Sequence, residues 1–149
     1  MPPIRRILHP TDFSRASGAA FARAIDMAKS NGAELIVLHV IVPVLAIPAE
    51  GYVSPDLYQD LDASNRSAAQ KQIDTQVARA KKAGVKKVSS LILEGTTAER
   101  IAQAAKSRRA DLIVIGTHGR TGLARFFLGS VASRVVSMAS CPVLTVRGK

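Results

Sequence analysis

Short apolar runs alternate along this chain with longer segments in which apolar residues recur at helical spacing. The short runs are bounded by proline, glycine or polar residues and are too brief for helices, so they predict strands. The run Leu35–Val40 is apolar at nearly every position, which is typical of a strand covered on both faces in a parallel sheet. The predicted strands span residues 4–9, 35–40, 85–93, 111–115 and 142–146.

Four segments between these runs predict helices. Ser14 can cap the first helix, and Thr96 with Glu99 has the spacing of a capping box at the start of the third. Gly32 and Gly84 follow the first two helices, where a left-handed residue commonly ends a helix. The predicted helices span residues 14–31, 62–83, 96–108 and 130–140.

The alternation of these elements predicts an α/β fold. We expect a single domain over residues 1–149, built on an open parallel sheet with helices on both faces and right-handed crossovers. Residues 41–61 interrupt the alternation, because they contain three prolines and a glycine. We interpret them as a loop or flap insert. Connections of this length in a compact domain are commonly functional.

Composition narrows the classes of protein. Of the 149 residues, 47% are hydrophobic and 21% are charged, as in an ordinary globular domain. The single cysteine excludes a disulfide framework and a thiol-rich metal site. No segment has the pattern of a secretory signal or of a membrane span. We therefore expect a soluble, cytoplasmic protein without a membrane partner.

The charge balance is strongly basic. Lysine and arginine number 21 against 11 acidic residues, which gives a formal charge of +10 and favours anionic partners. The basic residues cluster near helix ends, where cations are favoured by the helix dipole, so we interpret them as solvent-exposed surface. The alternative is that they form a surface that binds nucleic acid. Only 4% of residues are aromatic and tryptophan is absent, which disfavours stacking on nucleobases. The clusters are Arg79, Lys81, Lys82, Lys86 and Lys87, and Lys106, Arg108 and Arg109.

The segment Gly116–Ser130 is the strongest candidate for chemistry. It follows an apolar strand and precedes a helix, which places it at the carboxyl edge of the sheet, where α/β proteins bind ligands. Its glycines allow backbone N–H groups to approach an anion, and Gly129 with Ser130 begins a helix whose positive end suits phosphate. Arg120 and Arg125 add positive charge. The segment lacks the GxxxxGK[ST] and GxGxxG patterns, so a ligand-free glycine loop stays an alternative to a phosphate site.

The histidines do not predict a metal site. His9, His39 and His118 lack the spacing of zinc ligands, and we expect hydrogen bonds to satisfy His9 and His39 at strand ends. A triad of Ser130, His118 and Asp12 is conceivable from composition. Ser130 is better explained as a helix cap, and no G-x-S-x-G elbow is present.

Three parts of the chain carry a more specific signal. They are Ile7–Ser14, Leu35–Val40, and Asp111–Gly119 continuing through Gly129–Ala132 to Cys141–Leu144. Together they resemble the universal stress protein family. The spacing Gly116, two residues, Gly119, nine residues, Gly129-Ser130 is similar to that of the family's ATP-binding branch. The resemblance implies a five-stranded, Rossmann-like sheet of strand order 3-2-1-4-5, similar to the adenine nucleotide alpha hydrolases, with its switch point between the first and fourth strands.

The resemblance also implies a nucleotide site. Pro10, Thr11 and Asp12 would lie at the adenosine end, and Val40 would meet adenine through its backbone. The insert after Val40 would form a flap over the site. No dedicated metal cage is visible, although Mg²⁺ could accompany the ATP phosphates. The residues implied to hold ribose and phosphates are Gly116, Thr117, His118, Gly119, Arg120, Gly129, Ser130, Val131 and Ala132.

The last predicted strand is expected to be a dimer interface. It is short and apolar and lies at an edge of the sheet, where an uncovered strand invites pairing. In the family this strand pairs with its copy across a two-fold axis, so the resemblance implies a symmetric homodimer. The interface residues would be Val143, Leu144, Thr145 and Val146.

The sequence leaves three hypotheses for the function of the protein. The resemblance implies an ATP-binding stress-response or regulatory protein with at most slow ATP hydrolysis or self-phosphorylation. The sequence offers no clear general base and no Walker-B carboxylate, so we predict no efficient enzyme and assign no catalytic residue. The alternative is a nucleotide-independent module that docks an acidic protein or a nucleic acid through its basic surface. A hydrolase using Asp12, His118 and Ser130 is the third hypothesis.

Overall fold

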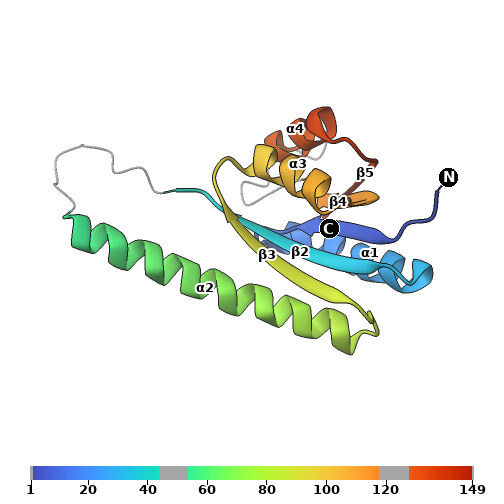
Figure 1. Cartoon of the computed structure of the whole chain (residues 1–149), viewed down its shortest axis with the longest axis horizontal. Coiled ribbons are helices and arrows are strands. Elements are labelled where there is room, and N and C mark those ends of the chain that lie inside the picture. Colours follow the sequence, from blue (N-terminus) through green and yellow to red (C-terminus); the bar gives the residue numbers. More distant parts are fainter. Residues whose placement is uncertain (1, 44–53, 118–127, 149) are drawn as a thin grey trace.

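The fold is a parallel sheet between two layers of helices. The computed structural model describes residues 2–43, 54–117 and 128–148. The five strands pair in parallel in the order β3-β2-β1-β4-β5, which confirms the predicted sheet (Figure 1). The elements are β1 (Arg6–Pro10), α1 (Arg15–Asn31), β2 (Glu34–Ile41), α2 (Pro55–Lys82), β3 (Val88–Glu94), α3 (Thr97–Ser107), β4 (Leu112–Gly116), α4 (Ser130–Met138) and β5 (Val143–Val146).

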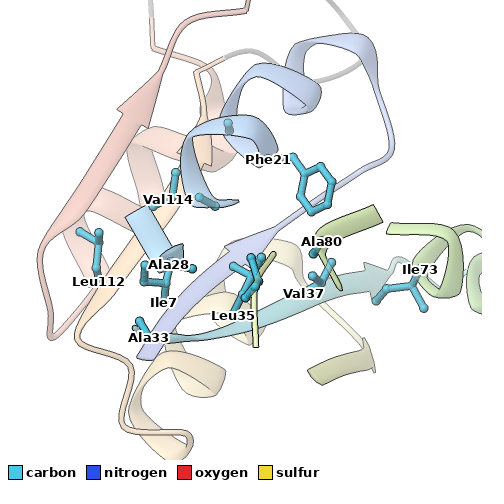
Figure 2. Close-up of a cluster of buried hydrophobic side chains, with 13 residues drawn as sticks. Ile7, Phe21, Ala28, Ala33, Leu35, Val37, Ile73, Ala80, Leu112 and Val114 are labelled. Atoms are coloured by element: carbon cyan, nitrogen blue, oxygen red, sulfur yellow. The ribbon is translucent and has the colours of Figure 1, made fainter. Parts of the chain in front are cut away.

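The core lies on both faces of the central strands, because successive side chains of a strand point to opposite faces. Ile7 and Val37 belong to the cluster beneath α1 and α2, which also contains Phe21 and Ile73 (Figure 2). Leu8 of the same strand β1 belongs to the cluster beneath α3 and α4. Two covered faces explain why the central strands are apolar at nearly every position.

The predicted helix caps are right in part. The Ser14 hydroxyl accepts a hydrogen bond from Ser17 N at 3.3 Å, as expected for the cap of α1. Thr96 stands at the N-cap of α3 but its side chain makes no capping hydrogen bond, so the predicted capping box is wrong. Gly129 is the N-cap of α4, so Ser130 is the first helical residue and not the cap.

Helix α2 begins earlier than the sequence predicts. It starts at Pro55, so residues 55–61 of the predicted insert are helical. The Ser54 hydroxyl accepts Leu57 N at 3.2 Å, and proline is well suited to the first helical position. The first buried residue of α2 is Ala69, so the start of the helix lacks an apolar face that would have revealed it. No helix in the described ranges is long and apolar enough to cross a membrane.

Candidate functional site

The carboxyl ends of β1 and β4 meet at the centre of the sheet. Ile7 pairs with Leu112 and Leu8 with Ile113, so the two strands are direct neighbours. The chain leaves β1 into α1 on one face, whereas α4, which follows β4, packs on the other face. This is the switch point that the resemblance implied, and ligands of open α/β sheets bind at such a point.

The turn after β1 is held by hydrogen bonds of Thr11. Its backbone N–H donates to Leu38 O at 2.8 Å, which ties the end of β1 to β2. Its hydroxyl lies 3.1 Å from the hydroxyl of Ser17 and accepts Phe13 N at 3.0 Å. Thr11 is buried, so this network fixes the turn against the start of α1.

Asp12 shapes the same turn. One of its carboxylate oxygens accepts Ser14 N at 2.9 Å, an interaction typical of aspartate before a helix. Phe13 follows with a φ of 63°, a left-handed conformation that is uncommon for a bulky residue and is found mainly in turns and at functional sites. Asp12 is therefore positioned at the edge of the sheet, half-buried, by the backbone around it.

His39 lies beside the turn after β1 and is a further candidate for the site, whereas its sequence position predicted only a hydrogen-bonded residue at a strand end. Its Nδ1 lies 2.8 Å from Thr11 O, which confirms the expected hydrogen bond. Its ring packs against Phe13, with 4.5 Å between the ring centroids. Val40 follows at the end of β2 and is buried on the opposite face, among the residues under α3 and α4. The signal that could have identified His39 is its place beside the end of the adjacent strand β1.

His9 lies beneath the turn and is fully buried. Its Nδ1 is 2.9 Å from Val114 O, whereas Nε2 has no partner among the described residues, so the expectation of a satisfied histidine is half right. Burial lowers the pKa of His9 to about 4, and the hydrogen bond to Val114 and the charge of Asp12 only partly oppose this effect. His9 is therefore neutral at pH 7.

Gly116 and Thr117 carry β4 to the same edge. A Cβ at Gly116 would lie 3.3 Å from Ala16 O, so the glycine lets the end of β4 approach the first turn of α1. Thr117 N donates to Val146 O at 2.9 Å, and Thr117 O accepts Gly129 N at 2.6 Å. The start of α4 is thus tied directly to the end of β4. His118, Gly119 and Arg120 of the predicted site lie outside the described residues.

The first turn of α4 presents backbone donors at this edge. Its first intrahelical hydrogen bond runs from Ser133 N to Gly129 O at 2.9 Å, so the N–H groups of Ser130, Val131 and Ala132 precede it. In the part of the chain that the structure describes, no side chain makes a capping hydrogen bond to this helix. Ser130 and Val131 are exposed and Ala132 is buried. A helix start of this kind can hold an anion, because its N–H groups and its dipole both favour negative charge.

The described side chains around these elements do not form a cluster of metal ligands. Among residues 2–43, 54–117 and 128–148, no three histidine, cysteine or acidic side chains lie close enough together to hold a metal ion. Near the switch point the described residues offer backbone amides, hydroxyl groups and the Asp12 carboxylate for hydrogen bonding.

Comparison with known proteins agrees with this fold. The family model described as "Universal stress protein family" matches residues 3–147. Universal stress protein MJ0531 of Methanocaldococcus jannaschii is 41% identical over 145 residues, covering 96% of this chain and 82% of that protein. The structure of the universal stress protein UspA from Lactobacillus plantarum is 27% identical with a TM-score of 0.83, covering 99% of this chain and all of the other.

A third similar structure, a universal stress protein in complex with cAMP, is 23% identical and covers 99% of each chain with a TM-score of 0.74. At this identity the likeness shows the fold alone. The family match and the relative in Methanocaldococcus jannaschii each span nearly the whole of this chain. The chain therefore belongs to the universal stress protein family.

Proposed function

We propose that this protein binds ATP at the switch point and acts in the cytoplasm as a stress-response or regulatory factor. The observation that carries the proposal is the hydrogen bond from Gly129 N to Thr117 O. It holds the donor-rich start of α4 at the end of β4, and β4 is the neighbour of β1, which leads into the turn at Thr11 and Asp12. One element thereby offers a place for phosphates and the other a place for the nucleoside, as a nucleotide at a switch point requires.

The phosphates would lie at the start of α4. The N–H groups of Ser130, Val131 and Ala132 can donate to phosphate oxygens, and glycine at the N-cap leaves room for them to approach. Gly119 and Arg120 would complete the contacts from the segment between β4 and α4. Since the described residues provide no cage for a metal ion, Mg²⁺ would be held mainly by the phosphates themselves.

The adenine base would meet the backbone of Val40. Leu38 O points toward β1, where it accepts Thr11 N. Val40 lies two residues further on, so its N–H and C=O point to the same side of β2, beyond the end of β1 at Pro10. A flat base in that position gains backbone hydrogen bonds, while Thr11 and Asp12 lie beside it toward the ribose.

Any turnover of ATP would be slow. Asp12 is the acidic residue of the turn, and one of its oxygens is already engaged with Ser14 N. Efficient phosphoryl transfer needs a residue that orients the attacking water together with dedicated ligands for the metal. We therefore propose ligand-controlled regulation, with hydrolysis or self-phosphorylation at most a slow side reaction.

Nucleotide analysis of the freshly purified protein, followed by calorimetric titration with ATP, ADP and AMP with and without Mg²⁺, tests the proposal. The double variant Gly119→Ala/Gly129→Val should lose more than about tenfold in affinity, because side chains would occupy the space of the phosphates. Arg23→Ala, an exposed position in the middle of α1, is the matched control and should bind nucleotide as the wild type does. A folded, nucleotide-free wild type that binds none of the three nucleotides would refute the proposal and favour a nucleotide-independent docking module.

We also propose that β5 pairs with its copy in a symmetric homodimer. β5 is an edge strand, and its four residues are half-buried. Pro142 O and Val146 O accept hydrogen bonds from Ile113 N and Thr117 N. The alternate residues Val143 and Thr145 therefore turn their N–H groups outward, where an antiparallel copy can accept them.

The substitution Thr145→Pro tests this interface, because it removes an outward N–H while leaving the bonds to β4 in place. Sedimentation analysis should show a dimer for the wild type and a monomer for Thr145→Pro, with unchanged circular dichroism. Thr145→Val is the matched control and should stay dimeric. A wild type that is monomeric at micromolar concentration would contradict the proposed dimer.

A further inference from the structure

A basic trough crosses the amino edge of the sheet, at the opposite end of the strands from the switch point. Two adjoining hollows of about 340 and 810 Å³ form it, and they share Arg6, Glu34 and Arg109. The trough passes the start of β1 and the start of β2, and it reaches the turns that precede β3 and β4. A hollow of this size is in the range of small-ligand sites.

The trough holds more positive than negative charge. Glu34 forms an ion pair with Arg6 at 3.6 Å and accepts the Ser89 hydroxyl at 3.1 Å. Asp111 accepts the backbone N–H groups of Arg5 and Arg6 at 2.8 and 2.9 Å. Both carboxylates are therefore engaged. The cations that line the trough are Arg5, Arg6, Lys87, Arg108 and Arg109.

Most of these cations have no acidic partner among the described residues. Of the ion pairs between described residues, the pair of Arg6 with Glu34 is the one that involves a cation of the trough. Guanidinium groups present planar forks of N–H donors that match phosphate oxygens. The trough thus offers several such forks within one concave surface.

The conformation of Arg109 separates this trough from an ordinary basic surface. Helices α1, α2 and α3 all end here in the same way: a left-handed residue donates its N–H to the carbonyl three residues back. That residue is Gly32 with φ 60° after α1, Gly84 with φ 109° after α2, and Arg109 with φ 54° after α3. Attraction to the helix dipole explains why a cation lies near the end of α3. It does not explain why arginine occupies position 109, whose left-handed conformation glycine would adopt without strain.

We propose that this trough is a second anion site, which binds a linear oligophosphate through its phosphate groups. Four strands with neighbours about 4.8 Å apart give the row of cations a length of about 14 Å. An extended peptide places carboxylates on one side only about every 7 Å, so it would match fewer of the cations. Phosphates linked to one another bring more charge into the same length. None of the described residues that line the trough is aromatic, so they offer no platform for nucleobases.

Calorimetric titration with inorganic tripolyphosphate at low ionic strength tests the site. Arg109→Gly should lower the affinity at least about tenfold and raise Tm by about 2–4 °C, because it removes both the guanidinium and the backbone strain. If Arg109 had only a structural role, its replacement would not weaken tripolyphosphate binding and at the same time raise the stability of the protein. Arg23→Ala removes the same charge from the exposed face of α1 and should leave the affinity within about twofold of the wild type.

Three results would overturn the proposal. One is an Arg109→Gly variant that binds tripolyphosphate as the wild type does, or an Arg23→Ala variant that loses as much. The second is loss of tripolyphosphate binding in Gly119→Ala/Gly129→Val, which would place the anion at the switch point. The third is tighter binding of a thymidine oligonucleotide or a hexaglutamate peptide of similar charge. Retained tripolyphosphate binding in the glycine variant, with ATP binding lost, would support two separate sites.

Discussion

The buried histidine beneath the switch point should make the stability of the protein depend on pH. In the folded state the pKa of His9 is about 4, against 6.5 for an unperturbed histidine. Between these values the unfolded chain binds a proton that the folded protein rejects, so stability is full above about pH 6.5 and falls as the pH decreases toward 4. The complete loss would be about 3 kcal/mol, and about 2 kcal/mol of it would occur between about pH 7.5 and pH 5.

Urea unfolding at these two pH values measures the effect, and His9→Asn isolates it. The asparagine amide can occupy the position of Nδ1 and still donate to Val114 O, but it does not titrate. It leaves a cavity beside Phe21, so the variant should be less stable than the wild type at neutral pH and lose about 2 kcal/mol less on acidification.

The core variant Ile73→Ala is the matched control for this experiment, since it weakens the buried cluster that contains Phe21 but retains His9. Its stability should fall with pH in parallel with that of the wild type. Equal pH dependence in the wild type and His9→Asn would show that His9 is not the group responsible, and the reasoning from its burial would be refuted.

Three further substitutions test the packing and the helix ends. Ile73→Ala itself should cost about 2–5 kcal/mol in urea unfolding, because Ile73 is fully buried between α2 and the sheet. Ser14→Ala should cost about 1 kcal/mol by thermal unfolding, since the Ser14 hydroxyl caps α1 at Ser17 N, and a change below a few tenths would contradict that role. Ser130→Ala should change stability by less than about 0.5 kcal/mol, because Ser130 is exposed and makes no capping bond, and it should leave any slow ATP hydrolysis measurable. Abolished hydrolysis with unchanged nucleotide binding would instead revive the hydrolase hypothesis.

The central strands could be predicted from the sequence because burial on both faces leaves a continuous apolar run. The run that became β2 is covered by helices on each side, and Ile36 and Val37 occupy opposite layers. The start of α2 could not be predicted in this way. Its first turns bury no side chain, so no apolar period distinguishes a helix from a polar loop there.

The residues of the candidate site could also be predicted only in part. Thr11, Asp12 and Gly116 follow the ends of predicted strands, and Gly129 precedes a predicted helix. The structure brings these positions to the carboxyl edge of the sheet. The contact of His39 with the turn at Thr11 joins residues 28 positions apart, so no local pattern announces it.

The unusual backbone conformation of single residues could not be predicted from the sequence either. Phe13 and Arg109 adopt left-handed conformations that neither residue type favours. Such a conformation depends on what surrounds the residue in the folded protein and not on its neighbours along the chain.

The central place of β1 has a consequence for synthesis on the ribosome. β1 pairs early with β2, but its other neighbour is β4, and the contact of Arg6 with Asp111 spans 105 residues. At about 5–20 residues per second, translation needs about 5–20 s to supply that partner. Until then one edge of the first strand and the apolar surface around Leu8 have no covering. We therefore expect the nascent chain to be more prone to aggregation in this interval than after its second half has emerged.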